Sequence, residues 1–232
     1  MDNIIQGISE FQDKVFPGQQ AMYQRLVRDG QQPKALIIAC ADSRVSPEHI
    51  TQAGPGELFV CRNAGNIVPP FALQTGGVSA TVEYAVAVLG VHDIIVCGHS
   101  DCGAMKGLAG DPAALAAIPT VANWLKHGAA ARQIVDQTYP DLTDAERIRA
   151  LSLENVVAQL AHLRTHPSVA AGIAQGKIAL HGWFIDIHDG TVLALDGITG
   201  RFRPLDEGGD FPVAQPAAPR QASDVEFLAA AE

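Results

Sequence analysis

The stretch DIIVCGHSDC, residues 93–102, decides how the rest of the sequence is interpreted. Its first half, Asp93 to Cys97, is a short apolar run of residues that favour β-structure, and it predicts a buried strand. Its second half carries two metal-binding side chains close together, because only two residues separate His99 from Cys102. The sequence therefore predicts a strand that leads directly into a metal-binding loop.

Two similar apolar runs precede this stretch. Lys34 to Ala39 (KALIIA) and Leu58 to Cys61 (LFVC) are also predicted strands, and we expect all three runs to be fully buried. Between the second and third, Gly77 to Leu89 has apolar residues at helical spacing. Strands that alternate with helices indicate an α/β fold, here a single domain with a central, mainly parallel sheet flanked by helices.

Helical and strand patterns continue on both sides of this region. At the N-terminus, apolar residues recur at helical spacing up to Pro17-Gly18, which we expect to end the pattern, and we assign a helical arm to about residues 3–29. Later segments predict one long helix and a β-hairpin. These are Ala145 to Thr165 for the helix, ended by His166-Pro167, and Ile178 to Ile187 with Val192 to Asp196 for the hairpin.

The last residues differ in composition from the rest. We assign residues 1–207 to one domain and 208–232 to a Pro/Ala-rich tail that is expected to be poorly ordered. The apolar patch Val225 to Leu228 near the end of the tail either has no partner or docks the protein onto one.

Charge and composition exclude several functions. The 25 acidic residues outnumber the 16 Lys and Arg residues, which gives a net charge of −9 and argues against binding nucleic acid or an anionic membrane. Apolar stretches are too short to span a membrane, and Met1 to Lys14 lacks the pattern of a signal peptide. We therefore expect a cytoplasmic enzyme acting on small molecules, with its four cysteines reduced.

A third metal-binding side chain follows the first predicted strand. Cys40 and His99 both lie where parallel strands end, so Cys40, His99 and Cys102 can form a three-ligand site with one open position, which is typical of catalytic zinc. Sulfur and imidazole favour zinc over magnesium or calcium. Taken alone, the His-x-x-Cys pair is equally compatible with a structural or accidental origin. Asp42 and Arg44 follow Cys40 closely, either beside the metal or as a solvated pair that shapes the turn.

Other candidate ligands fit the site less well. Cys97 and Cys61 lie within apolar runs and are expected to be small core residues. His162 and His166 are four apart on a predicted helix, but no third ligand stands nearby, so we expect a capping or surface role.

Four ordered motifs closely resemble the β-class carbonic anhydrases. They are CADSRV from Cys40, RNAGNIVPP from Arg62, GGVSATVEYAV from Gly76 and CGHSDCGAMKG from Cys97, and HGW at 181–183 fits the late strand of the family. The resemblance extends from about Ile4 to Leu205. It is greatest to the plant-like, open-site subgroup, and within it to bacterial members associated with cyanate metabolism and with cyanobacterial carboxysomes. Ile37 and Ile185 replace the Trp and Tyr of an inhibitory bicarbonate site in the other subgroup.

This resemblance implies a function and a set of roles. One Zn²⁺ per chain is held by Cys40, His99 and Cys102, with water or hydroxide as fourth ligand, and carbon dioxide is hydrated reversibly to bicarbonate and a proton. Asp42 and Arg44 are implied to be catalytic, and Asp42 binds the metal only in a closed form of the site.

The resemblance also implies a substrate pocket that is shared between subunits. Gln31 and the amide of Gly103 would hold substrate oxygens, and Phe59, Ala64 and Tyr84 would line the apolar part. A homodimer or a higher even oligomer is implied, with the N-terminal helix as its arm. The alternative is that Phe59 and Tyr84 are core aromatics and that Gln31 is a polar loop residue.

Two other functions remain open at this point. Hydrolases of carbonyl sulfide or carbon disulfide share this fold and metal site. A non-catalytic zinc-binding scaffold is the other alternative, although it would have no use for Asp42, Arg44 or Gln31.

Overall fold

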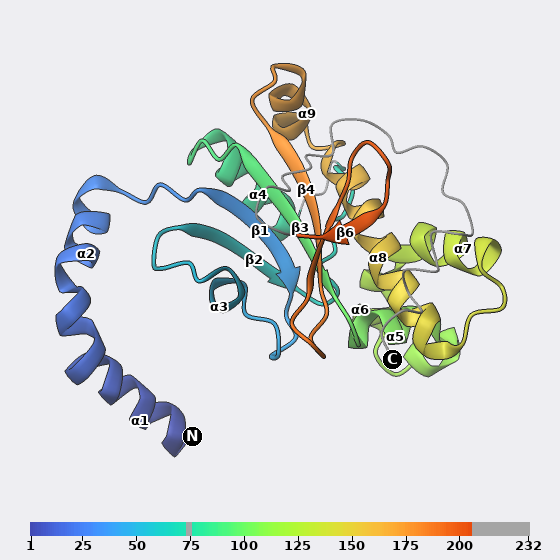
Figure 1. Cartoon of the computed structure of the whole chain (residues 1–232), viewed down its shortest axis with the longest axis horizontal. Helices are drawn as coiled ribbons and strands as arrows, with labels where there is room; N and C mark the ends of the chain where they lie inside the picture. Colours follow the sequence, from blue (N-terminus) through green and yellow to red (C-terminus); the bar gives the residue numbers. More distant parts are fainter. Residues whose placement is uncertain (73–75, 206–232) are drawn as a thin grey trace.

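A computed structural model describes residues 1–72 and 76–205 and shows a six-stranded sheet in the order β2-β1-β3-β4-β5-β6 (Figure 1). The first four strands along the chain pair in parallel, and the last two pair antiparallel. This arrangement confirms the predicted α/β class and the late hairpin. The strands are β1 (Ala35–Cys40), β2 (Leu58–Asn63), β3 (Asp93–His99), β4 (Ala179–Ile185), β5 (Val192–Leu195) and β6 (Phe202–Pro204).

Helices and helical turns precede β1 and connect the four parallel strands. One of them, the long helix that the sequence predicts near residues 145–165, is capped by Thr143 and Glu146, each of which bonds to the backbone of the other. The helices are α1 (Asp2–Glu10), α2 (Phe16–Asp29), α3 (Pro47–Thr51), α4 (Gly77–Ala87), α5 (Gly103–Ala109), α6 (Pro119–Leu125), α7 (Ala129–Thr138), α8 (Asp144–Leu163) and α9 (Pro167–Ala174). The short turns are η1 (Phe11–Val15), η2 (Pro112–Leu115) and η3 (Lys126–Gly128).

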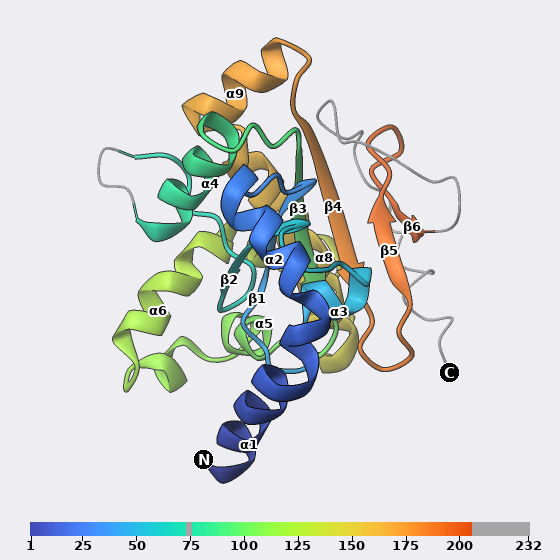
Figure 2. The same ribbon diagram turned by 90° about the vertical axis from the view of Figure 1, so that its left-hand side faces the viewer.

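Helices α4, α8 and α9 cover one face of the sheet (Figure 2). Alternate residues of β1 point to opposite faces, so Leu36 and Ile38 join the core beneath these helices while Ile37 joins a cluster on the other face. Two strand glycines let α8 approach closely. A Cβ atom on Gly98 or Gly182 would lie 2.8 or 3.0 Å from a methyl group of Val156.

Strand β2 is not fully buried, contrary to the prediction. It lies at the edge of the sheet and pairs only with β1, which leaves five of its residues half-buried and Arg62 exposed. Cys61 is likewise only partly buried. A short apolar run is compatible with a central or an edge strand, and only the strand order distinguishes the two.

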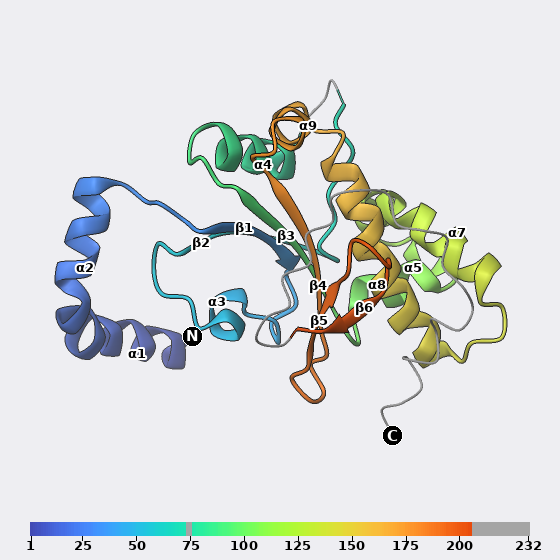
Figure 3. The same ribbon diagram turned by 45° about the horizontal axis from the view of Figure 1, so that its top comes forward.

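The N-terminal helix does not end at Pro17. Helix α2 continues from Phe16 to Asp29, and the π-helical turn η1 joins it to α1. In this turn the amide of Phe16 donates to the carbonyl of Phe11, five residues back, and the change of pattern accommodates a proline that has no N–H to donate. The resulting arm projects away from the sheet, and its residues Ile4, Ile5 and Ile8 are each more than half exposed (Figures 1 and 3).

Within the described residues, no helix combines the length and apolarity that crossing a membrane requires. The predicted Pro/Ala-rich tail lies outside these residues.

Candidate metal centre

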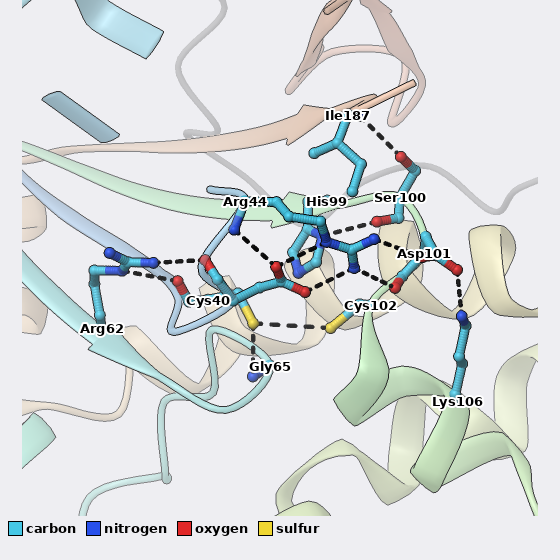
Figure 4. Close-up of polar contacts among 11 residues, drawn as sticks. Cys40, Arg44, Arg62, Gly65, His99, Ser100, Asp101, Cys102, Lys106 and Ile187 are labelled. Atoms are coloured by element: carbon cyan, nitrogen blue, oxygen red, sulfur yellow. Dashed lines mark hydrogen bonds and ion pairs between the residues drawn. The ribbon is translucent and has the colours of Figure 1, made fainter. Parts of the chain in front are cut away.

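The ends of β1 and β3 bring three candidate ligands together. These strands are parallel neighbours with Ala39 opposite Cys97, so Cys40 and the end of β3 at His99 lie at the same edge of the sheet. Cys102 follows in the loop and is the N-cap residue of α5. The ligand atoms of Cys40, His99 and Cys102 all lie within 4.8 Å of one another, and all three residues are buried (Figure 4).

The geometry of these side chains fits a tetrahedral metal ion. The two sulfur atoms are 3.9 Å apart. Two thiolates bound at about 2.3 Å to one tetrahedral zinc ion have sulfur atoms about 3.8 Å apart. His99 Nδ1 lies 2.7 Å from the carbonyl oxygen of Ser100, which can only accept, so Nδ1 carries the proton. The buried Nε2 has no hydrogen-bond partner and offers its lone pair to the site.

Close contact changes the acidity of both thiols. The hydrogen bond between the two sulfur atoms lowers the pKa of Cys40, and the same contact, together with burial, raises the pKa of Cys102. The pair therefore shares one proton without a metal, and Cys102 gains stabilising bonds from the amides of Met105 and Ala104 at the start of α5. A dipositive ion would replace that proton, because thiolates are the metal-binding form.

Asp42 and Arg44 form the pair that the sequence suggests, beside the donors. Arg44 donates from Nε and Nη2 to the two carboxylate oxygens of Asp42, at 3.0 and 2.8 Å. These bonds hold the pKa of Asp42 well below its usual range. Arg44 also binds Asp101 at 2.8 Å, and Lys106 forms an ion pair with the same carboxylate (Figure 4). The guanidinium of Arg44 is thus held by Asp42 on one side and by Asp101 on the other.

The two loops that carry the donors are fixed by residues that were not predicted from the sequence. Arg62 donates to the carbonyl oxygens of Cys40 and Asp42, at 3.0 and 2.7 Å, which anchors the chain after β1. The Ser100 hydroxyl donates to Asp186 at 2.9 Å and accepts the amide of Ile187. Arg62 is the first residue of the RNAGNIVPP motif. A charged side chain directly after a predicted apolar strand is a feature of the sequence that could have indicated this anchoring role.

The predicted pocket residues are divided between two places. Gly103 begins α5 next to Cys102, and Ala64 follows Asn63, which pairs with Cys40. Phe59, by contrast, pairs with Leu36 near the start of β1 and stacks on Tyr84 at a centroid distance of 5.9 Å. Gln31 is exposed before β1. Gln31, Phe59 and Tyr84 therefore lie toward the end of the strands opposite the metal donors of their own chain.

Cys97 and His166, which the sequence did not assign to the metal site, lie in the interior of the protein. Burial raises the pKa of the Cys97 thiol to about 12, in agreement with a core role. The sequence predicts a capping or surface role for His166, but its side chain makes no cap hydrogen bond to α9. It is buried, and its Nε2 lies 3.0 Å from the carbonyl oxygen of Pro69. In the described part of the chain, Cys40, His99 and Cys102 are the only cluster of three or more potential metal ligands.

Polar side chains of α8 hold the segment that follows β2. Asn155 donates to the carbonyl of Gly65 at 3.0 Å, and Gln159 accepts the amide of Val68 at 2.9 Å and donates to Asn155 at 2.8 Å. His162 contacts the carbonyl of Val68 at 2.8 Å. Both Asn155 and Gln159 are completely buried, so this network supports the loop next to Cys40 from within the core.

Together, the sheet edge and its buried donors define an α/β protein with a candidate metal centre. The model of the carbonic anhydrase family matches residues 35–192. A carbonic anhydrase of Pseudomonas aeruginosa is 54% identical over 89% of this chain and 93% of its own length. The chain belongs to the carbonic anhydrases, and within them to the β-class whose solved structures it matches, and it is an enzyme.

Solved structures of the class have the same architecture. The β-carbonic anhydrase CcaA superimposes with a TM-score of 0.88 at 40% identity, covering 92% of this chain and 94% of that one. A tetrameric enzyme from Sordaria macrospora gives a TM-score of 0.67 at 32% identity and covers 84% and 92% of the two chains.

The buried network of α8 yields a stability prediction. Gln159→Leu should lower the free energy of unfolding by about 2–4 kcal/mol, because the amide of Val68 and the side-chain oxygen of Asn155 lose buried partners. Urea unfolding at one protein concentration measures this. The matched control is Gln137→Leu at an exposed position of α7, where a change within about 0.5 kcal/mol is expected. Equal, small effects would show that the network contributes little.

Proposed function

We propose that this protein hydrates carbon dioxide reversibly to bicarbonate and a proton, with one zinc ion per chain held by Cys40, His99 and Cys102. The single observation that carries the proposal is the buried, unpartnered Nε2 of His99 beside two thiols whose spacing suits one tetrahedral ion. Three protein ligands leave one position open for catalysis. Bound there, zinc would supply a water molecule of lowered pKa as the nucleophile for carbon dioxide.

We assign the orientation of this nucleophile to Asp42. Its carboxylate remains ionised because Arg44 binds both oxygen atoms, so it can accept a hydrogen bond but cannot donate one. Arg44 in turn is kept in place by Asp101. A fixed acceptor directs the reactive lone pair toward the substrate carbon, which is a positioning effect.

We further propose that the active form is a dimer or a higher even oligomer. Gln31, Phe59 and Tyr84 can line a pocket only if a second copy brings them to the donors of the first, because they lie away from their own metal centre. The exposed apolar stripe of α1 is a suitable contact for that copy. Assignment to the open-site subgroup, residues 1–207 as one domain, and docking by the tail remain predictions.

Metal binding is tested by removing one donor at a time. Cys40→Ser, His99→Ala and Cys102→Ser should each lose most zinc and carbon dioxide hydration, because each removes one of three ligands. The control, Cys97→Ser, should keep about one zinc per chain. Elemental analysis and stopped-flow hydration give both readouts. Zinc retained in all three ligand variants would contradict the assignment, and sulfide release from carbonyl sulfide without carbon dioxide hydration would favour the hydrolase instead.

The Asp42–Arg44 pair makes a separate prediction. Arg44→Ala should keep zinc and lose hydration activity by about 100-fold, the scale of a misplaced catalytic group, because the freed Asp42 can occupy the open ligand position. Adding Asp42→Ala removes that competing ligand, so the double variant should be more active than Arg44→Ala alone. Rates are compared at equal zinc content. Parent activity in Arg44→Ala would remove the pair from the mechanism.

Oligomerisation through the arm is also testable. Ile4→Asp with Ile8→Asp should reduce the mass measured by light scattering toward that of one chain, because charges replace the exposed apolar stripe. Asn3→Asp with Gln6→Asp adds the same charge to polar positions of α1 and should leave the mass unchanged. An unchanged mass in the isoleucine variant would exclude the stripe as an essential contact.

A further inference from the structure

One peptide group connects the side chain of Trp124 to the sulfur of Cys40. The indole Nε1 of Trp124, on α6, donates to the carbonyl oxygen of Ala64 at 2.8 Å. The amide of Gly65, which belongs to the same peptide group, donates to the sulfur of Cys40 at 3.4 Å (Figure 4). An N–H donor on α6 and a proposed metal ligand on β1 are therefore joined through two hydrogen bonds in series.

The surroundings hold this peptide group in place. Gly65 has a φ of +81°, and a Cβ atom there would lie 2.9 Å from Cβ of Ala104 and 3.0 Å from the terminal methyl of Met105. Only glycine meets both requirements. On the following peptide, Asn155 donates to the carbonyl of Gly65 at 3.0 Å. The amide of Gly65 is thus fixed toward Cys40 by contacts on both sides.

A donor on the carbonyl strengthens the N–H of the same group. Hydrogen bonds in series polarise one another, so the indole of Trp124 makes the Gly65 amide a better donor to sulfur. That bond withdraws electron density from a thiolate, and contacts of this kind adjust how strongly a ligand donates to its metal. We propose that Trp124 is a positioning residue that tunes Cys40 as a metal ligand through the Ala64–Gly65 peptide. This inference rests on the proposed metal site.

A simple packing role for Trp124 is the competing explanation. Its ring also contacts His127 edge-on, with centroids 5.8 Å apart, so replacing the whole ring changes packing as well as hydrogen bonding. The chain contains only two tryptophans, Trp124 and Trp183. In a Trp183→Phe background, all tryptophan can therefore be replaced by benzothienylalanine, which has nearly the shape of tryptophan but a sulfur atom in place of N–H. Only position 124 then differs.

The readout is the thiolate-to-cobalt charge-transfer band of Co²⁺-substituted protein. Loss of the indole N–H should leave Cys40 more electron-rich, so the band should move to longer wavelength in the benzothienylalanine protein than in Trp183→Phe with tryptophan at position 124. Trp124→Phe should move it in the same direction. If Trp183→Phe has the same spectrum with benzothienylalanine as with tryptophan at position 124, the proposed role of Trp124 is overturned. The proposed metal site would not be affected by that result. Absence of the band from both proteins would overturn the proposed metal site and this inference with it.

Discussion

Parallel pairing between β1 and β3 is the constraint on which the site depends. Each strand contributes one donor at its carboxyl end, and their register determines whether Cys40 and His99 can meet. A slip of two residues, which preserves the faces of the sheet, would move one donor by about 6.6 Å along the strand, farther than the 4.8 Å that contains all three ligand atoms. The sheet therefore positions the metal centre. The alternating apolar residues that bury the strands also set the register that brings Cys40 and His99 together.

The loops after the two strands depend on charges from elsewhere in the fold. Arg62 binds carbonyls after β1, and Ser100 joins the loop after β3 to Asp186, beyond the end of β4. Arg149 of α8 also forms an ion pair with Asp186. Three distant parts of the chain, at Arg62, Arg149 and Asp186, thus support the two loops that carry the donors. A catalytic metal site requires ligands that are held rigidly in place by hydrogen bonds from the residues around them.

Several elements could be predicted from the sequence because each is a local pattern. The end of each apolar run, the HSDC loop and the Asp42–Arg44 pair each lie within a few residues, so spacing and chemistry identify them one by one. That Cys40 and His99, 59 residues apart, belong to one metal site was implied by the resemblance to the family. The position of β2 at the sheet edge could not be inferred, since it depends on strand order. Nor could the roles of Asn155 and Gln159, which act on partners about 90 residues away. On a helical wheel they are polar residues with no visible reason to be buried.

The charged side chains beside the donors affect how substrate and product approach and leave the site. Asp42 and Asp101 carry two negative charges there, Arg44 and Lys106 carry two positive ones, and they neutralise one another in pairs. Carbon dioxide, which is uncharged, gains nothing from an electrostatic attractor and arrives by diffusion alone. Arg62 adds a positive charge next to this group, where it is bound to two backbone carbonyls, while the chain as a whole carries −9. The long-range field of a chain with net charge −9 repels an approaching bicarbonate ion and leaves uncharged carbon dioxide unaffected, and added salt weakens this repulsion.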